Sequence, residues 1–253
     1  MTRTGWPAAC ALALGGIGYS SWVLEGVLNT GVDPVNSFLS ELYAEGKPHR
    51  DLFATTEQIT GLLVVVAAVC GLAGRPRRSR TTIGWVALLC FGAATIADAL
   101  VPLGGCRGAR SCTASRGLFP QLYQPHALTS TLAVTSIALA VLVFTASAWR
   151  NRRWPLVRTA GLVVLSAGVA ATLWMLVGDN LPGHHALGIA QRAQVGSISL
   201  WLLLFAAALA RENRTVTRTR RRRSRRTPTA RVPRPPRANL RRRSGIRPRR
   251  RQS

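Results

Sequence analysis

Long blocks of apolar residues, separated by short polar segments, dominate the pattern along this chain. Six blocks can be marked, at residues 6–28, 52–74, 82–103, 126–149, 156–177 and 195–210. Each is close to the ~20 residues that an α-helix needs to cross ~30 Å of hydrocarbon, and few charged residues lie inside them. Hydrocarbon offers no partner to an unpaired backbone N–H or C=O, and the blocks are too long and unalternating for barrel strands. The pattern therefore predicts an all-α, polytopic membrane helix bundle with about six transmembrane helices.

The arginines predict how these helices are oriented. They cluster between the second and third blocks, between the fourth and fifth blocks, and after the sixth block, whereas the alternate loops hold all but one of the acidic residues that lie outside the blocks. Loops rich in arginine stay on the cytoplasmic side, so an even number of crossings places both termini in the cytoplasm. The first block remains apolar as far as Leu28, longer than the core of a signal peptide, and we expect it to be retained as a span. The pattern indicates a multi-pass protein of the cell membrane.

Residues 211–253 form a second segment of different composition. The chain has 34 lysines and arginines against 9 aspartates and glutamates, and this tail carries most of the formal net charge of +25. Its arginine runs alternate with prolines and contain almost no apolar residues, so we expect a disordered cytoplasmic tail. We expect it to bind anionic lipids of the inner leaflet, at about 1 kcal/mol per basic residue near the surface. It lacks aromatic residues that stack on bases, which disfavours nucleic-acid binding.

The use of arginine in place of lysine also bears on the source of the chain. Lys47 is the one lysine, and alanine, glycine and arginine are abundant throughout. This bias indicates a GC-rich bacterial genome.

The five cysteines divide into two kinds by location. Cys10, Cys70 and Cys90 lie inside apolar blocks, where a free thiol behaves as a small hydrophobe. Cys106 and Cys112 share the loop between the third and fourth blocks, which the arginine pattern places outside the membrane, where a disulfide can persist. A metal site in this loop would need further thiolates or imidazoles, and the loop has none. We therefore expect a Cys106–Cys112 disulfide and no pairing of the other three cysteines.

Asp98 is the most informative single residue, because a carboxylate inside a membrane span normally faces a partner or a wet cavity. It lies near the outer end of the third block, and His126 begins the fourth block at comparable depth. A short loop makes these blocks antiparallel neighbours, so the two side chains can meet, with Thr129 and Ser130 on the same face as His126. The group is either a polar clamp between two helices or a functional pocket, and the sequence leaves both open.

Residues 33–45, after the first block, carry a second polar pattern. Asp33 and Pro34 have the character of an N-cap and a first helical position, and apolar residues then recur at helical spacing. We expect a short amphipathic helix whose apolar face lies on the bilayer surface or caps the bundle. Its polar face would show Ser40 and Glu41, and Ser40 would close over the cavity beside Asp98.

The four histidines all fall on the predicted outer side: His49, His126, His184 and His185. Zinc accepts imidazole and carboxylate ligands, so together with Asp98 they could hold a metal with an open position for a hydrolytic water. Adjacent His184 and His185 project in different directions, however, and no two histidines have the spacing of one helical turn. We assign no metal ligand and no cofactor.

Several short motifs resemble a known family. They are Ser40-Glu41-Leu42 followed by Gly46 and Pro48, Asp98 with Pro102, a cysteine-bearing loop, and His126 at the start of the fourth block. Together they look like the uncharacterised bacterial membrane family called domain of unknown function nine-nine-eight, over about residues 6–210. The resemblance implies a six-helix membrane protein in which Ser40, Asp98 and His126 are the positions carried over, and it implies no reaction. The arginine-rich tail departs from the short ends usual in that family.

Two classes of function remain open for the outer polar residues. As a binding component, the protein would hold a lipid headgroup or small solute in an outer-leaflet cavity, through Asp98, His126, Ser130 and Glu41. As an enzyme, it would use Asp98, His126 and Ser40 in acid-base or metal-dependent hydrolysis. The sequence has no phosphate-binding glycine loop, no Gly-x-Ser-x-Gly elbow and no His-Glu-x-x-His motif, so binding is the favoured interpretation.

The predicted topology can be tested with reporter fusions or cysteine accessibility at five positions. Gly46, Gly108 and Gly183 should report outside, whereas Arg78 and Asn151 should report inside, because arginine-rich loops stay in the cytoplasm. A reversal at any one of the five would contradict this topology.

Overall fold

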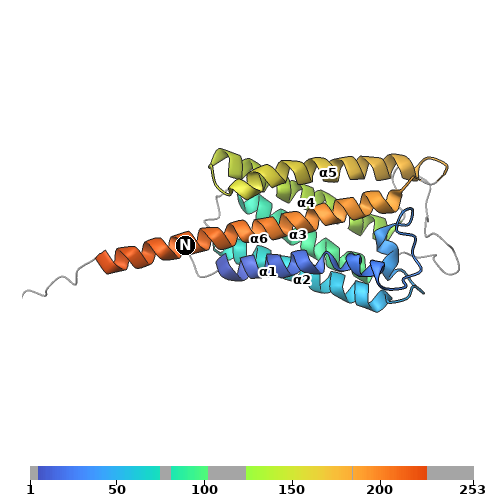
Figure 1. Ribbon diagram of the computed structural model, residues 1–253, viewed down its shortest axis with the longest axis horizontal. Helices are drawn as coiled ribbons and strands as arrows, with labels where there is room; N and C mark the ends of the chain where they lie inside the picture. Colours follow the sequence, from blue (N-terminus) through green and yellow to red (C-terminus); the bar gives the residue numbers. More distant parts are fainter. Residues whose placement is uncertain (1–4, 75–80, 102–123, 184, 227–253) are drawn as a thin grey trace, which may run out of the picture. The chain divides into compact units, whose positions relative to one another are not determined.

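The computed structural model describes residues 5–74, 81–101, 124–183 and 185–226, with side chains as far as Thr217. These residues form six α-helices and two short 3-10 helices (Figure 1). In chain order they are α1 Gly5–Gly18, η1 Ser21–Gly26, η2 Leu39–Tyr43, α2 Arg50–Ala73, α3 Thr81–Leu100, α4 Pro125–Arg150, α5 Pro155–Asp179 and α6 Leu187–Arg226. Six segments are long and apolar enough to cross a membrane, α1 and η1 together forming the first. The all-α prediction is confirmed.

The predicted apolar blocks locate the middle helices closely. Helices α2 to α5 each begin and end within three residues of the blocks marked from the sequence. Apolar length decides these bounds, and Pro125 and Pro155 stand in the first turn of α4 and α5, where the missing N–H costs no helical hydrogen bond.

The first and sixth helices differ from their predicted blocks. Helix α1 ends at Gly18 in a glycine-rich stretch of low helix propensity, and the chain continues as η1. Helix α6 begins at Leu187, eight residues before its block, because the charge of Arg192 is paired within the protein. It also extends to Arg226, past the predicted end at Ala210, while the compact unit formed by the helices ends at Thr215. The rest of the predicted tail, residues 227–253, lies outside the described residues.

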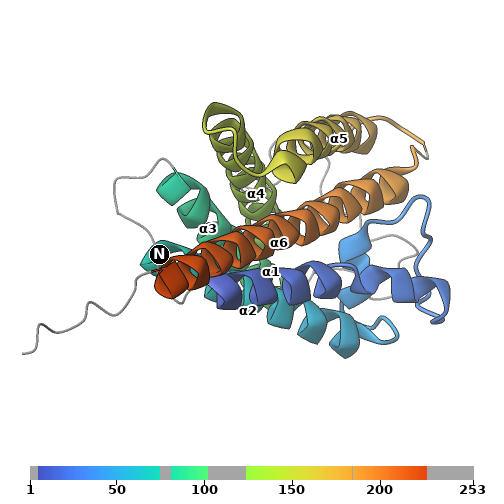
Figure 2. The same ribbon diagram turned by 60° about the vertical axis from the view of Figure 1, so that its left-hand side comes forward.

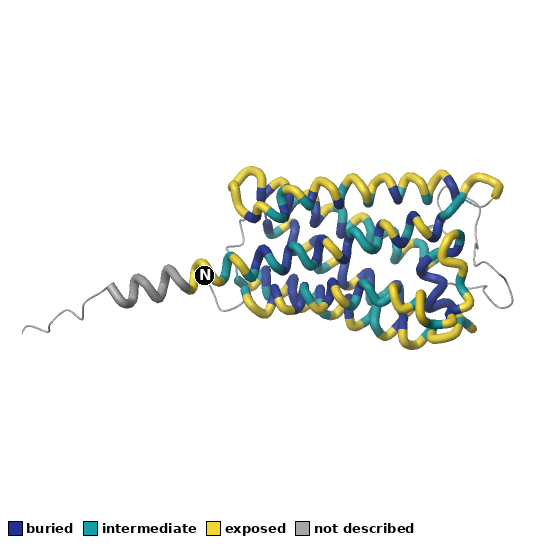
Figure 3. The backbone as a smooth tube through the Cα atoms, viewed as in Figure 1, coloured by how far each residue is buried: buried dark blue, intermediate teal, exposed yellow. Residues whose placement is uncertain are grey.

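Within this unit, consecutive helices pack side by side from α1 to α5, and α6 runs back along α1 (Figures 1 and 2). A Cβ atom added to Gly16 of α1 would lie 2.9 Å from Leu203 of α6, which shows how closely these two helices approach. Helix α5 lies at the edge and is mostly exposed (Figure 3), with large apolar residues such as Val163 and Trp174 on its surface. Such a face suits contact with lipid.

An aromatic cluster joins α3, α4 and α6 in the core. Phe144 of α4 lies at its centre, with ring centroids 5.2 Å from Trp85 of α3 and 4.4 Å from Phe205 of α6. Trp201 stacks on Phe205 at 5.1 Å, and Trp154 approaches the same ring edge-on at 5.6 Å. Four of these rings are almost inaccessible, so the cluster fixes the spacing of three helices by dense packing.

The crossing of α2 and α3 depends on two glycines. A Cβ atom on Gly61 would lie 2.6 Å from the carbonyl oxygen of Gly92, and one on Gly92 would lie 2.7 Å from the carbonyl oxygen of Gly61. Backbone therefore meets backbone at this point, the arrangement that small residues permit in membrane helices. No side chain can move aside to relieve a substitution here.

We expect Gly92→Ala to destabilise the protein by roughly 1–3 kcal/mol, because α2 and α3 must separate to admit the methyl group. Gly168→Ala in α5 is the matched control, since a Cβ atom there meets nothing within 4 Å. The control should be neutral or slightly stabilising, as alanine favours helix more than glycine does. Thermal denaturation in detergent measures both variants, and equal midpoints would refute the close crossing.

Candidate functional site

The connection between η1 and α2 folds into one end of the bundle, which we call the cavity end. It contains no amphipathic α-helix, so that prediction is wrong: only the 3-10 helix η2 forms. Asp33 instead closes a tight turn, accepting hydrogen bonds from the Val35 N–H at Oδ1 and the Asn36 amide at Oδ2, both at 2.9 Å. Gln191 of α6 accepts a hydrogen bond from the Leu39 N–H, which attaches η2 to the bundle.

The two candidates on this segment are buried, which corrects their expected place on an exposed polar face. Ser40 is 7% exposed and Glu41 is fully buried. Glu41 Oε1 accepts a hydrogen bond from the Phe38 N–H at 3.1 Å and so closes the first turn of η2. The other alternative, in which this segment caps the bundle, agrees with the structure. Burying Leu42 and Tyr43 beside Phe53 is favourable enough to offset the cost of burying the neighbouring polar residues.

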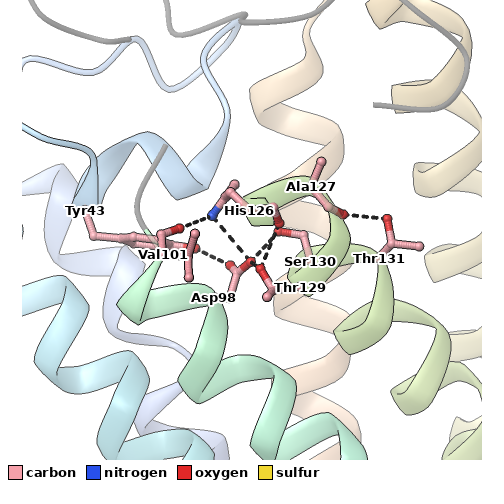
Figure 4. Close-up of polar contacts among 8 residues, drawn as sticks. All are labelled: Tyr43, Asp98, Val101, His126, Ala127, Thr129, Ser130 and Thr131. Carbon is pink, nitrogen blue, oxygen red and sulfur yellow. Dashed lines mark hydrogen bonds and ion pairs between the residues drawn. The ribbon is translucent and has the colours of Figure 1, made fainter. Parts of the chain in front are cut away.

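Asp98 near the end of α3 is the centre of a hydrogen-bond cluster (Figure 4). Its Oδ1 accepts from Thr129 at 2.6 Å and from Ser130 at 2.7 Å, both on α4. Its Oδ2 accepts from the Tyr43 hydroxyl of η2 at 2.7 Å. The imidazole of His126 lies 3.4 Å from Oδ1 through Nδ1. The predicted meeting of Asp98 with residues of α4 is therefore present, and η2 joins it as a third element.

The hydrogen-bond partners define how His126 and Tyr43 are protonated. His126 Nδ1 lies 2.9 Å from the carbonyl oxygen of Val101, and a carbonyl only accepts, so Nδ1 donates. This bond orients the ring beside Asp98, and Nε2 is the ring nitrogen that takes no part in it. Burial raises the pKa of the Tyr43 phenol well above its ordinary value, and the neighbouring Asp98 carboxylate raises it further. Tyr43 therefore remains a neutral donor to Asp98.

A cavity of about 70 Å³ lies beside this cluster, within the cavity end. A buried water needs roughly 10–15 Å³ on this measure, so several waters or one small solute would fit. Six elements and the turn before η1 supply its polar lining: Tyr19, Ser21, Trp22, Ser40, Tyr43, Glu57, Thr95, Asp98, Ser130, Gln191 and Gln194. The predicted candidates Ser40, Asp98 and Ser130 are thus brought to one cavity, whereas Glu41 closes its own turn instead.

Three polar groups in this lining are not used by the fold. The Thr95 hydroxyl and the Trp22 indole N–H are buried without a hydrogen-bond partner among the described residues. Glu57 of α2 has no hydrogen bond or ion pair within the same part of the chain and lines the cavity beside Asp98. Buried polar groups are nearly always satisfied in proteins, so unpaired groups gathered around one space make it a candidate binding site.

Two residues of the site were not predicted from the sequence: Glu57 of the cavity and Tyr43, the partner of Asp98. Glu57 lies inside the second apolar block, and a carboxylate in a spanning helix is itself a signal of a functional position. Tyr43 gave no comparable signal, because its contact with Asp98 spans 55 residues of chain.

A second missed feature is a buried ion pair between Glu25 and Arg192. Arg192 donates from Nε and Nη2 to the two carboxylate oxygens of Glu25, at 2.5 and 2.7 Å. Its Nη1 donates to the carbonyl oxygens of Ser37 and Gly188, at 3.1 and 3.0 Å. The pair links η1 to the first turns of α6, with both side chains about nine-tenths buried. Glu25 inside the first apolar block was the signal that could have revealed it.

The remaining predicted chemistry is not assembled by the described residues. In that part of the chain, no three His, Cys, Asp or Glu side chains are placed to hold one metal ion. Cys10, Cys70 and Cys90 are free thiols, as expected. Cys106, Cys112 and His184 lie outside the described residues, so the disulfide stays a prediction.

Comparison with known proteins places the chain in a family. It matches the family described as Protein of unknown function (DUF998) over residues 12–208. Neither the curated proteins nor the solved structures contain a match. The matched range covers the second half of α1, all of α2 to α5, and α6 as far as Ala208, so it includes every residue of the cavity. With most of its length inside that match, the chain belongs to the DUF998 family, as the resemblance of its motifs predicted.

Proposed function

We propose that this integral membrane protein binds a small polar solute in the cavity beside Asp98, on the outer side of the cell membrane. The observation that carries the proposal is the group of unpaired polar atoms around one cavity: the buried Trp22 indole N–H and Thr95 hydroxyl, and the partly exposed carboxyl group of Glu57. The arginine-rich loops at the opposite end support an outward-facing position for the cavity.

The Asp98 cluster and the cavity have different roles in this proposal. Asp98 is satisfied by three hydroxyl groups and ties η2 and α4 to α3, which is a structural task. Glu57, Thr95 and Trp22 contribute no comparable bond to the fold. Keeping unsatisfied polar groups inside a membrane bundle costs free energy, typically about 1–3 kcal/mol for each group. A bound solute would recover that energy.

A free solute suits the cavity better than a whole lipid. The lining residues come from η1, η2, α2, α3, α4 and α6, so protein surrounds the space from several directions, and α5 contributes no residue to it. A lipid headgroup remains the alternative ligand. The hydrolase alternative gains no support from the described residues, which assemble no metal-ligand group and hold His126 Nδ1 against a backbone carbonyl.

Access to the cavity can be tested with a cysteine at Thr95. We expect Thr95→Cys to react with a charged methanethiosulfonate added from outside at least about tenfold faster than Ala87→Cys, because only a thiol that water reaches forms the reactive thiolate. Ala87 is an equally buried position on α3, about two turns away from the cavity, and serves as the control. Rates are measured above the background of the natural cysteines. Equal rates at the two positions would contradict a solute-accessible cavity.

The structural role of Asp98 predicts a graded response to substitution. Asp98→Ala should lower the free energy of unfolding by about 2–4 kcal/mol, because the Tyr43 and Ser130 hydroxyls lose their buried acceptor. Asp98→Asn keeps the shape and one acceptor oxygen, so its loss should be less than half as large. Thermal denaturation in detergent distinguishes the two. A neutral Asp98→Ala would show that the cluster does not hold η2 in place.

A further inference from the structure

The two carboxyl groups in the cavity lining belong to Asp98 and Glu57, and no lysine, arginine or histidine belongs to its lining among the described residues. Three basic groups near this end have other partners: Arg192 is held by Glu25, His126 donates to the carbonyl of Val101, and Arg50 donates to the carbonyl of Tyr43. The lining therefore offers a charged partner to a cation and none to an anion.

The two carboxylates differ in what already neutralises them. Asp98 accepts three hydrogen bonds from hydroxyl groups and lies beside the His126 imidazole. Glu57 lines the same cavity and has neither a hydrogen bond nor an ion pair within the described residues. In surroundings of low polarity, a cation placed between them would be strongly favoured over an anion.

The rest of the lining describes the kind of cation. Four aromatic residues line the cavity, namely Tyr19, Trp22, Tyr43 and Phe53, together with aliphatic side chains such as Leu42 and Val195. Aromatic faces attract ammonium groups and suit cations that are weakly hydrated. A metal ion would instead require several oxygen ligands at short distance, and no three candidate ligand side chains converge in the described chain. The cavity also has room for several waters, which is a larger volume than one bare metal ion fills.

We propose that the solute is a small alkylammonium cation, bound with its charge between Glu57 and Asp98 and its carbon atoms against Trp22, Tyr19 and Phe53. This inference rests on the proposed function and names its ligand class. The same group occurs in free amines and in the ammonium headgroup of some lipids. The Thr95 hydroxyl oxygen can accept a hydrogen bond from the ammonium group, whereas the donor-only indole N–H of Trp22 is left to a water in the cavity.

The test uses the full-length protein in detergent, with tetramethylammonium chloride and methylammonium chloride as probes and sodium chloride at equal ionic strength as reference. At saturation, at least one ammonium salt should raise Tm above the sodium value by about 2–4 °C, because a ligand that binds only the folded state stabilises it. Glu57→Gln should weaken the apparent affinity by roughly tenfold or more, since the ligand loses its charge partner. Equal midpoints in ammonium and sodium salts would overturn the proposal.

The matched control is Glu45→Gln, which removes an exposed carboxylate from the same end of the bundle. It should retain the full ammonium response, and a loss equal to that of Glu57→Gln would overturn the assignment to the cavity. If Glu57→Gln fails to fold, the Thr95→Cys protein supplies an independent readout. A cationic methanethiosulfonate should then label it faster than an anionic one of similar size, and the reverse order would overturn the proposal.

These measurements separate the two claims. A cavity that is labelled at Thr95→Cys but shows no preference for cations would leave solute binding standing and refute the ligand class. Absence of labelling would refute solute binding itself. A final arm compares dihexanoyl phosphatidylethanolamine with dihexanoyl phosphatidylglycerol. Stabilisation by the first lipid alone supports a lipid-borne ammonium group, whereas stabilisation by the free salts alone supports a soluble amine.

Discussion

The structure of the cavity end depends on satisfying one carboxylate inside the membrane bundle. Asp98 lies in a spanning helix, where an unpaired charge is costly, and it recruits hydroxyl groups from Thr129, Ser130 and Tyr43. The bonds to Thr129 and Ser130 join α3 to α4, and the bond to Tyr43 holds η2 against the helices. Because η2 is held there, the connection that contains it becomes a buried cover instead of a surface helix. The cavity beneath exists because this cover is fixed at its centre.

The Glu25–Arg192 pair has a related role on the other side of the cover. Arg192 binds the carboxylate of Glu25 with two nitrogen atoms and the carbonyl oxygen of Ser37 with a third. It therefore holds η1, the cover and α6 together with charge-assisted hydrogen bonds that are screened little when buried. Breaking such a pair by removing one partner leaves a buried charge, so both residues are constrained even though neither lines the cavity.

The polar and apolar parts of the bundle are separated along its length. Away from the cavity the aromatic cluster around Phe144 packs α3, α4 and α6 densely, and midway along α2 and α3 the Gly61–Gly92 crossing brings two backbones together. At the cavity end, side-chain hydrogen bonds join the elements, and the unpaired groups of Trp22 and Thr95 line the cavity. A rigid scaffold that carries an incompletely satisfied polar cavity is the arrangement expected of a binding site. The family match extends over both parts.

The sequence by itself determined the helices, because the length and apolarity of each span depend only on local composition. It located α2 to α5 closely, identified Asp98 with His126 as a contact between neighbouring helices, and led to the family. Only the tertiary structure decided what lies between distant segments. Residues 33–45 have helical periodicity, yet hydrogen bonds to Asp98 and Gln191 fold them into a cover, and periodicity cannot foresee such partners. Glu25 and Arg192 are separated by 167 positions, and their pairing becomes visible only when η1 and α6 meet. The cavity and its charge arise in the same way, since residues from six elements enclose it and no single segment carries its pattern.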